Sequence, residues 1–399
     1  MLNVSIDIGN SLTKCVYKNN QKVLTRMSLP NTFHLSKKTD IKRSVPELNS
    51  GITFDVPESD IIEISQIDFN YVMTDDSNEE LSKVFGLTPD TDKLRVIGGD
   101  TAETQFYDEL ERPLLVDKVS QRVSYVSVLA TLNAVSDIEG GDNNFNIIIT
   151  LPLNETDENS QNLIKQRLQG KHIIETKGAT KEINILKVFV IGECFASSVS
   201  YHFDVNSARK QNISPALLDG TYLVVNMGAG TSDLALFNRG KFVEKSKSTL
   251  PVAGNTVREM LIEAFNDKYR VRPTIQSAEQ AIKTGIMKVG AKTIDVYDMV
   301  LDVKSAMSLQ LLEGIKKYCI SRSIDIRSLS CLVCTGGGAL EGAFKTSDGE
   351  KVIPSNVHFL KQFIEESTEF TEVLVMAHPR WDDAVGAFIV LQTLLRANS

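Results

Sequence analysis

No apolar run in the sequence approaches the roughly 20 residues that a membrane-spanning helix requires. The segment Met1–Asp7 contains no basic residue and already includes the carboxylate of Asp7, whereas a secretory signal begins with basic residues followed by an apolar stretch. Basic residues are in deficit, with 43 Lys and Arg against 51 Asp and Glu, a formal charge of −8. Because non-specific DNA affinity depends on basic groups that neutralise phosphates, we expect a cytoplasmic protein without direct nucleic-acid or membrane contact.

Cysteine is scarce, and its five residues form no repeated pattern. Cys331 and Cys334 have C-x-x-C spacing, but they lie in an apolar run, and no second pair or nearby histidine completes a zinc site. We expect both on a buried strand and the protein in a reducing compartment. The sequence also lacks a G-x-x-x-x-G-K-[ST] P-loop and a strand-linked G-x-G-x-x-G motif, which excludes those two classes of nucleotide site.

The chain of 399 residues is long enough for two domains. Segment 204–220 is polar, contains Pro215 and lacks periodicity, so we place the boundary there. The predicted bounds are 1–204 with 375–399 for the first domain, an irregular insertion at about 30–112 packed on one side of it, and 220–374 for the second.

Hydrophobic patterning predicts that both domains are α/β. Each is expected to begin with a strand–turn–strand unit, over 3–17 and 222–237. Further buried strands are predicted at 146–151, 183–191 and 330–335, and helices at 120–135, 154–168, from 254 onward, 296–319 and 382–396.

An internal repeat is the most informative feature of the sequence. Residues 6–14 (IDIGNSLTK) align with residues 225–233 (VNMGAGTSD). In each, a polar residue near the end of an apolar strand is followed two residues later by glycine and then by small or hydroxyl residues. Such turns let backbone N–H groups approach a phosphate closely. Either turn alone would be read as a tight hairpin, but the matched pair favours phosphate binding.

A run of three glycines, 336–338, follows the apolar strand predicted at 330–335. It leaves an uncovered backbone surface suited to a flat base or an α-phosphate, although three glycines also serve as a simple bend.

These motifs resemble those of the actin, Hsp70 and sugar-kinase superfamily. Residues 7–14 resemble its first phosphate motif, 226–233 its second, 335–339 its adenosine motif and 383–387 its second connecting helix. The resemblance implies an α/β, actin-like (ribonuclease H-like) two-domain fold with a nucleotide cleft between duplicated domains.

Within the superfamily, several stretches are similar to the ParM-type bacterial actins of plasmid partition. They are PNTF at 30–33, TLPL at 150–153, IGE at 191–193 and PVAGN at 251–255. ATP, or GTP, and Mg²⁺ are the cofactors that this resemblance implies.

The resemblance also implies roles for individual residues. Asp7 would help to hold hydrated Mg²⁺ through water, and Glu193 would orient the attacking water. Nucleotide-binding residues implied in the first domain are Gly9, Asn10, Ser11, Thr13 and Lys14. Those implied in the second are Gly228, Ala229, Gly230, Thr231, Ser232, Gly336, Gly337 and Gly338, with Glu279 and Lys283 reaching the ribose.

Some of these residues have simpler explanations. Glu193 at a helix start would also interact favourably with the helix dipole. Lys14 would also be explained as a solvated charge on a hairpin. Glu279 and Lys283 have the spacing of an exposed i, i+4 ion pair.

Asn226 departs from the superfamily, which usually has aspartate at this place. It is counted with Asp7 and Glu193 among the expected catalytic residues. An amide can hold a water molecule but cannot carry negative charge or accept a proton, so we expect slow ATP hydrolysis. The sequence leaves open whether Asp233 on the same hairpin substitutes in part.

The resemblance implies an ATPase that polymerises into filaments and segregates plasmid DNA through a DNA-bound adaptor protein. Two alternatives stay open on the same fold. One is a non-polymerising scaffold that binds nucleotide as a structural cofactor, and the other is a small-molecule kinase.

Overall fold

The computed structural model describes residues 1–10, 12–36, 54–55, 61–73, 78–87, 93–106, 109–112, 117–176, 179–339, 344–345, 352–367, 372–376 and 378–397. Ser11 and much of the predicted insertion lie outside these residues. The chain divides into two compact units, Met1–Lys210 with Asp383–Ser399 and Gln211–Asp382, which are described separately. In the part of the chain described, no helix is long and apolar enough to cross a membrane.

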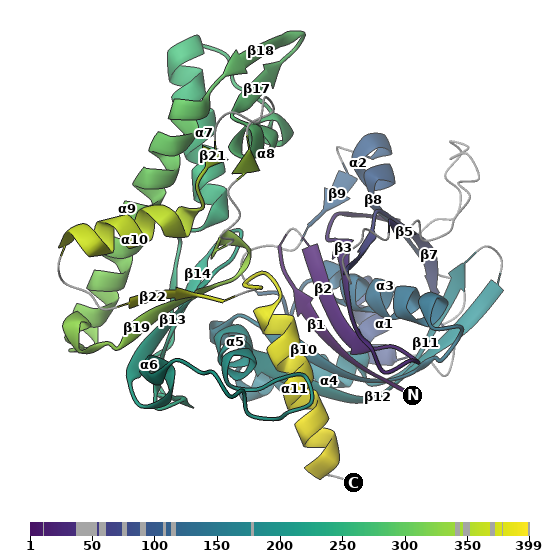
Figure 1. The fold of residues 1–399 in the computed structure, drawn as a ribbon. Coiled ribbons are helices and arrows are strands. Elements are labelled where there is room, and N and C mark those ends of the chain that lie inside the picture. The colour runs from purple at the N-terminus through teal and green to yellow at the C-terminus, as the bar shows by residue number, and fades with distance from the viewer. Residues whose placement is uncertain are drawn as a thin grey trace. The chain divides into compact units, whose positions relative to one another are not determined.

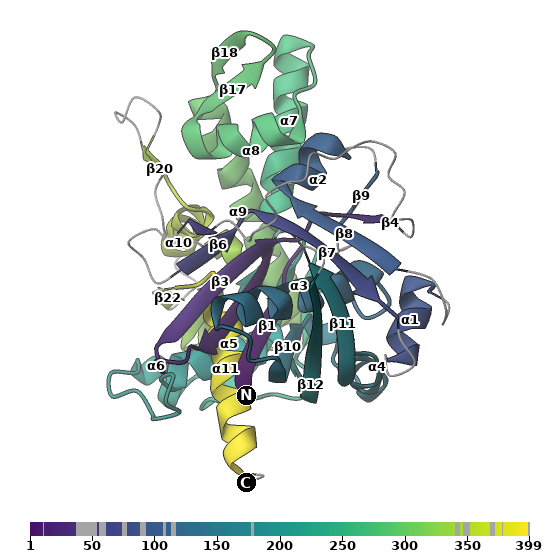
Figure 2. The same ribbon diagram turned by 90° about the vertical axis from the view of Figure 1, so that its right-hand side faces the viewer.

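The first unit is built on one large mixed sheet (Figures 1 and 2). Its strand order is β5-β6-β3-β2-β1-β10-β12-β11-β7-β8-β4-β9. The strands are β1 (Leu2–Ile8), β2 (Leu12–Lys18), β3 (Leu24–Pro30), β4 (Phe33–Ser36), β5 (Phe54–Asp55), β6 (Ile61–Ile64), β7 (Gln66–Val72), β8 (Lys93–Gly99), β9 (Leu110–Glu111), β10 (Asn144–Leu151), β11 (Gly170–Thr176) and β12 (Ala179–Gly192). The helices are α1 (Glu79–Phe85), α2 (Asp100–Gln105), α3 (Arg122–Ile138), α4 (Glu158–Leu168), α5 (Glu193–His202) and α11 (Asp382–Ala397), of which the last begins at the unit boundary.

Strand β10 is buried on both faces, which explains its unbroken apolar sequence. Ile147 and Ile149 belong to the main core, which includes apolar residues of α3. Ile148 points to the opposite face, where it packs with Ala196 of α5 and Ala387 of α11. Side chains alternate along a strand, so the sheet separates an α3 face from a face covered by α5 and α11.

Helices α5 and α11 cross at close range. A Cβ on Gly386 of α11 would overlap the carbonyl oxygen of Ala196 in α5, so the contact requires glycine. Ser5 of β1 donates from its hydroxyl to the carbonyl of Ala384 at 2.6 Å. These contacts place the first turn of α11 against the carboxyl half of β1.

The described strands of the segment predicted as an insertion belong to the first unit's sheet. Ser65 alone separates β6 from β7, yet β6 pairs with β3 and β7 pairs with β11, on either side of the strands β2, β1, β10 and β12. Gly99 has φ +74°, and a Cβ there would overlap the Ser65 carbonyl, so glycine permits the close packing at this bend. The segment therefore contributes hydrogen-bonded strands at both edges of the central strands.

The second unit has its own sheet, ordered β15-β14-β13-β19-β22, with β16 paired to β14. The strands are β13 (Thr221–Met227), β14 (Ser232–Asn238), β15 (Lys241–Phe242), β16 (Ser248–Leu250), β17 (Ile286–Val289), β18 (Lys292–Asp295), β19 (Cys331–Thr335), β20 (Phe344–Lys345), β21 (Val352–Ile353) and β22 (Glu372–Val375). The helices are α6 (Pro215–Leu218), α7 (Gly254–Tyr269), α8 (Ile275–Thr284), α9 (Tyr297–Ser321) and α10 (Asn356–Ser367). Cys331 and Cys334 lie buried on β19, as expected from their apolar surroundings, and burial raises the pKa of each thiol to about 12.

Most predicted elements are present with small shifts of their ends. One of the two largest shifts is at α4, which was predicted from 154 and begins at Glu158; the other is at β12, which was predicted from 183 and begins at Ala179. Asp157 is the N-cap of α4 and accepts the Ser160 N–H at 3.1 Å, while Leu153–Glu155 form a separate 3₁₀ turn after Pro152.

His172 on β11 is a buried imidazole within the first unit's core. One ring nitrogen, Nε2, donates to the Leu168 carbonyl at 2.7 Å, and the other, Nδ1, has no partner among the described residues. Burial lowers the pKa of His172 from 6.5 to about 4, because the protonated ring would be desolvated.

We expect this histidine to reduce stability in acid. The unfolded chain binds a proton near pH 6.5 and the folded one only near pH 4, so stability falls as the pH drops through that window. The full loss is about 3 kcal/mol by the linkage relation. Urea unfolding of wild type and His172→Gln from pH 7 to pH 4 checks this. The variant should lose less stability than wild type, and parallel curves would contradict the assignment.

Candidate functional site

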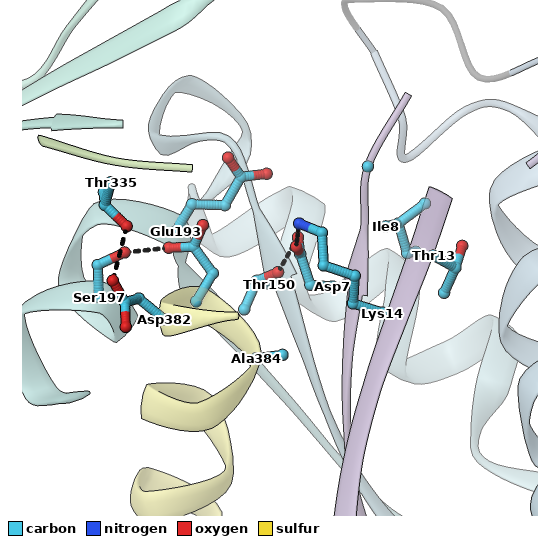
Figure 3. A network of polar contacts seen from close by, with 12 residues as sticks. Asp7, Ile8, Thr13, Lys14, Thr150, Glu193, Ser197, Thr335, Asp382 and Ala384 are labelled. Atoms are coloured by element: carbon cyan, nitrogen blue, oxygen red, sulfur yellow. Dashed lines mark hydrogen bonds and ion pairs between the residues drawn. The ribbon is translucent and has the colours of Figure 1, made fainter. Parts of the chain in front are cut away.

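The carboxylate of Asp7 lies at the carboxyl end of β1 and is held from both neighbouring strands. Asp7 is opposite Lys14 in the antiparallel β1–β2 pair and opposite Thr150 in the parallel β1–β10 pair. Lys14 Nζ donates to Asp7 Oδ2 at 2.6 Å, and the Thr150 hydroxyl donates to Oδ1 at 2.8 Å (Figure 3). Asp7 is only 3% exposed, so this carboxylate is buried with a cation and a hydroxyl as partners.

The first turns of two helices bring further carboxylates to the same face of the sheet. Glu193 is the first residue of α5, and Asp383 is the second residue of α11. The Ser197 hydroxyl of α5 donates to Asp383 Oδ1. Lys118, in the turn before α3, donates from Nζ to the Ile8 carbonyl at 2.6 Å and lies 3.3 Å from Glu193 Oε1.

We refer to these residues as the Asp7 cluster. Its members are Asp7, Lys14, Lys118, Thr150, Glu193 and Asp383.

The charges in the Asp7 cluster shift one another's pKa values. Burial alone would raise the pKa of Asp7, but the charge and hydrogen bond of Lys14, with Lys118 and Thr150, lower it below its usual value. Burial opposes the charge on Lys14, but Asp7, Asp383 and Glu193 raise its pKa. Burial and the charges of Asp7 and Glu193 raise the pKa of Asp383 well above its usual range. The cluster therefore keeps an ionised Asp7–Lys14 pair beside a carboxyl group that favours its neutral form.

The turn after β1 is supported from the α3 face of the sheet. Gly9 N–H donates to the Leu12 carbonyl at 3.1 Å. Asn31 is fully buried, donates from its amide to the Gly9 carbonyl, and accepts from the hydroxyls of Thr13 and of Ser127 in α3. Strand alternation puts Thr13 and Lys14 on opposite faces of β2. The Thr13 hydroxyl therefore supports the turn through Asn31, and a contact of Thr13 with the phosphates stays a prediction.

Asn10 completes the described part of this turn. Its Oδ1 is buried and has no partner among the described residues. Turning the amide over would present its NH₂ group, the donor that a phosphate oxygen requires.

The second unit repeats this arrangement with different charges. Asn226 is opposite Asp233 in the β13–β14 pair and opposite Thr335 in the parallel β13–β19 pair. Asn226, Asp233 and Thr335 therefore occupy the strand positions that Asp7, Lys14 and Thr150 occupy in the first unit. Asp233 accepts from the Thr249 hydroxyl at 2.6 Å.

The turn of the second unit has the same closing hydrogen bond. Gly228 N–H donates to the Thr231 carbonyl at 2.9 Å, as Gly9 does to Leu12. The carbonyls of Gly228 and Ala229 accept from the first N–H groups of α7, and Gly230 completes the turn. Ser232 is buried and donates to the Val252 carbonyl at 2.6 Å, so its hydroxyl supports the turn.

The glycine run lies against the end of β13. Gly336 has φ +83°, and a Cβ there would overlap Asn226 Oδ1 and the Met227 carbonyl. Gly338 lies close to Met227 as well, whereas a Cβ on Gly337 would meet no atom within 4 Å. Of the three, Gly336 is the glycine that the local packing requires.

Glu279 and Lys283 are exposed on α8. Glu279 pairs with Arg258 of α7 at 2.8 Å, a contact that fastens α8 to α7. A role at the ribose stays a prediction for both residues.

Comparison with known proteins agrees with this geometry. Residues 5–195 match the family described as the actin like proteins N terminal domain. No curated protein matches the chain. Among solved structures, Bacillus thuringiensis ParM with ATP is similar to this chain. The TM-score is 0.62, the sequence identity is 14%, and the match covers 100% of this chain and 100% of that chain.

The protein has an actin-like fold.

Two further structures support the same fold. ParM of pSK41, solved without nucleotide, has a TM-score of 0.62 at 14% identity, over 99% of this chain and 98% of that one. An archaeal actin homologue has a TM-score of 0.66 at 13% identity, over 99% and 100%. The expected resemblance to the actin superfamily, and within it to ParM, is confirmed for the fold.

The actin-like motifs pointed to Asp7, Lys14 and Glu193, which the structure brings together. Asn31, Thr150 and Asp383 lie in the similar stretches 30–33, 150–153 and 383–387 but were given no role, and Lys118 lies outside every motif. Thr150 was open to prediction, because the carboxyl ends of adjacent parallel strands meet at one edge of a sheet. Asp383 is a polar residue in the first turn of an apolar helix, and this position indicates a site residue less strongly than the strand end does for Thr150. Lys118 and Asn31 both lie in irregular segments. Asn31 belongs to the PNTF stretch at 30–33, whereas the sequence context of Lys118 carries no signal.

The Asp7 cluster fits a hydrated magnesium ion better than a directly bound one. Among the residues described, no three His, Cys, Asp or Glu side chains are grouped to ligate a metal. From the described residues, each Asp7 oxygen accepts one hydrogen bond, which leaves a lone pair for a metal-bound water. Mg²⁺ commonly keeps several waters and takes its remaining ligands from phosphates, which is consistent with this carboxylate.

The glycine run offers a matched pair of substitutions. Gly336→Ala should destabilise the protein by at least about 1 kcal/mol, because alanine disfavours positive φ and its Cβ overlaps Asn226. Gly337→Ala is the control, since its Cβ meets no neighbour. Thermal unfolding of the two variants compares them directly. Equal unfolding temperatures of the two variants would contradict the close contact between Gly336 and β13.

Proposed function

We propose that this protein is an actin-like ATPase that binds ATP with Mg²⁺, polymerises into filaments and segregates plasmid DNA through a DNA-bound adaptor. The observation that carries the proposal is the buried Asp7–Lys14 pair beside Glu193, at the strand ends that precede a glycine turn. The similarity of the fold to ParM, whose Bacillus thuringiensis form was solved with ATP, supports the choice of nucleotide.

In the first unit, the proposed phosphate contacts are the backbone of the turn at Gly9, the Asn10 amide and the Lys14 ammonium. Ser11 belongs to the same proposal but lies outside the described residues. Lys14 suits this role because a nearby phosphate provides further negative charge for its ammonium. Asp7 would hold waters of a bound Mg²⁺, which neutralises phosphate charge during transfer.

In the second unit, the proposed phosphate contacts are the backbone of residues 228–231. The run 336–338 is proposed to lie against the adenosine, with Gly337 as the glycine at which an added Cβ would meet no atom within 4 Å. Backbone contacts of this kind leave the preference for ATP over GTP open.

The proposed reaction is transfer of the γ-phosphoryl group to water. Glu193 is the candidate for orienting this water, because its carboxylate is 15% exposed, whereas Asp7 is enclosed by its partners. Positioning and charge stabilisation supply most of the catalysis in such reactions, so a single well-placed carboxylate is sufficient.

Filament growth would follow from head-to-tail association of ATP-bound subunits, an interface that does not close on itself. The net charge of −8 favours contact with DNA through an adaptor rather than directly. A non-polymerising scaffold that keeps nucleotide as a structural cofactor is the second candidate, and Asn226 is the observation that favours it.

One sample tests the proposal. Purified protein is mixed with ATP and Mg²⁺ while right-angle light scattering, pelleting and phosphate release are recorded. A nucleotide-dependent rise in scattering above a critical protein concentration, followed by phosphate release, supports a polymerising ATPase. A flat scattering trace with ATP bound would replace it with the scaffold.

Asn226 gives a sharper prediction. We expect Asn226→Asp to speed phosphate release, because it restores the carboxylate that the actin superfamily usually has at this place. The new carboxylate would be opposite Asp233, so the variant should also lose up to about 1 kcal/mol of stability at neutral pH. Asn238→Asp, at the exposed end of β14, is the control for added charge. Release that is unchanged or slower in Asn226→Asp would contradict the account of slow hydrolysis.

A further inference from the structure

Lys118 is a buried lysine, 4% exposed, that none of the sequence motifs includes. We propose that Lys118 is a positioning residue that fixes the carboxylate of Glu193 relative to the phosphate turn. This inference rests on the proposed function, in which Glu193 orients the attacking water.

The backbone at Lys118 is itself held in place by a buried carboxylate. Glu155, 7% exposed, accepts the N–H of Asp117 on one oxygen and the N–H of Lys118 on the other, both at 2.8 Å. Asp117 has φ +60°, a conformation that is unfavourable for a residue with a Cβ. Two charge-assisted hydrogen bonds offset that cost, so the turn presents Lys118 in one defined direction.

The ammonium of Lys118 connects two parts of the proposed site. Nζ donates to the carbonyl of Ile8, the residue directly before Gly9, at 2.6 Å. It also lies 3.3 Å from Glu193 Oε1 at the start of α5. An ammonium has three N–H groups, so it can satisfy both oxygens at once. Through Lys118, the Glu193 carboxylate and the backbone of the turn share one donor.

If Lys118 had only a structural role, an apolar side chain at this position would fill the space at a lower free-energy cost. Burying an ammonium costs several kcal/mol before any partner is counted, and an ion pair often recovers only part of that cost. The Ile8 carbonyl needs a donor, but the Glu193 side chain is partly exposed and could be hydrated instead. A buried cation that turns this carboxylate toward β1 is therefore better explained by the need to hold Glu193 in one orientation.

Four proteins test the proposal: wild type, Lys118→Met, Glu193→Gln and the double variant. ATP affinity is measured by titration and kcat by phosphate release. We expect Lys118→Met to lower kcat about 10- to 100-fold, as misplacing a catalytic group does. Its ATP affinity should stay within about threefold of wild type. In the Glu193→Gln background, the same substitution should change kcat by less than about threefold, because the two residues act as a unit.

Two further variants separate positioning from general damage. Lys118→Arg keeps a cation at this place and should recover part of the lost kcat. Lys181→Met is the matched control, since Lys181 also joins an amide oxygen and a carboxylate, on Asn133 and Asp137, outside the Asp7 cluster. It should leave kcat unchanged.

An equal loss of kcat from Lys118→Met with and without Glu193 would overturn the proposal, as would a parallel loss of ATP affinity. Absence of ATP hydrolysis by wild type would instead contradict the proposed function. In that event, the urea unfolding midpoints of the same four proteins decide whether Lys118 and Glu193 interact. If the midpoint shifts of the two single variants add up to the shift of the double variant, the two side chains do not interact and the inference is overturned.

Discussion

A buried carboxylate must be paired, and the pairing of Asp7 organises the first unit. Asp7 lies where β1, β2 and β10 end or begin, so the strand register itself supplies Lys14 and Thr150 as partners. Lys14 in turn experiences the charges of Glu193 and Asp383 from the first turns of α5 and α11. The close crossing of these helices at Gly386 and Ala196 is part of the same arrangement, because it brings both helix starts to one face of the sheet.

The internal repeat extends to the sheet register, but the charges differ between the two units. The triplet Asp7, Lys14 and Thr150 corresponds to Asn226, Asp233 and Thr335. In the first unit, a carboxylate is opposite a cation, and the pair is mutually stabilising. In the second, position 226 is opposite a carboxylate, so a neutral amide there avoids like-charge repulsion. This gives a structural reason for Asn226 that is independent of its effect on hydrolysis.

The sequence predicted the parts of the site that depend on local pattern. Both strand–turn–strand units and the glycine run follow from turn chemistry and hydrophobic periodicity, whereas the helix starting at Glu193 was implied by the resemblance to ParM-type actins. The hydrogen bond of Thr13 to Asn31 was not predicted, because neighbouring residues of a strand point to opposite faces and the motif alone does not show which face each side chain takes. Lys118 could not be found from the sequence because its role depends on contacts with distant segments, such as Glu155. Asn31 lies in the PNTF stretch, but its contact with Ser127 joins segments far apart in the chain and could not be predicted.

The central claim is that Asp7 holds the waters of a Mg²⁺ ion bound to the phosphates of ATP and does not merely pair with buried charges. Calorimetric titration of ATP into wild type and Asp7→Asn, each with Mg²⁺ and with EDTA, tests it most directly. The account predicts that the variant loses at least about 10-fold in affinity with Mg²⁺ and much less in EDTA, as when a group that orients metal ligands is removed. Equal affinity of folded wild type and folded variant for ATP with Mg²⁺ would contradict it.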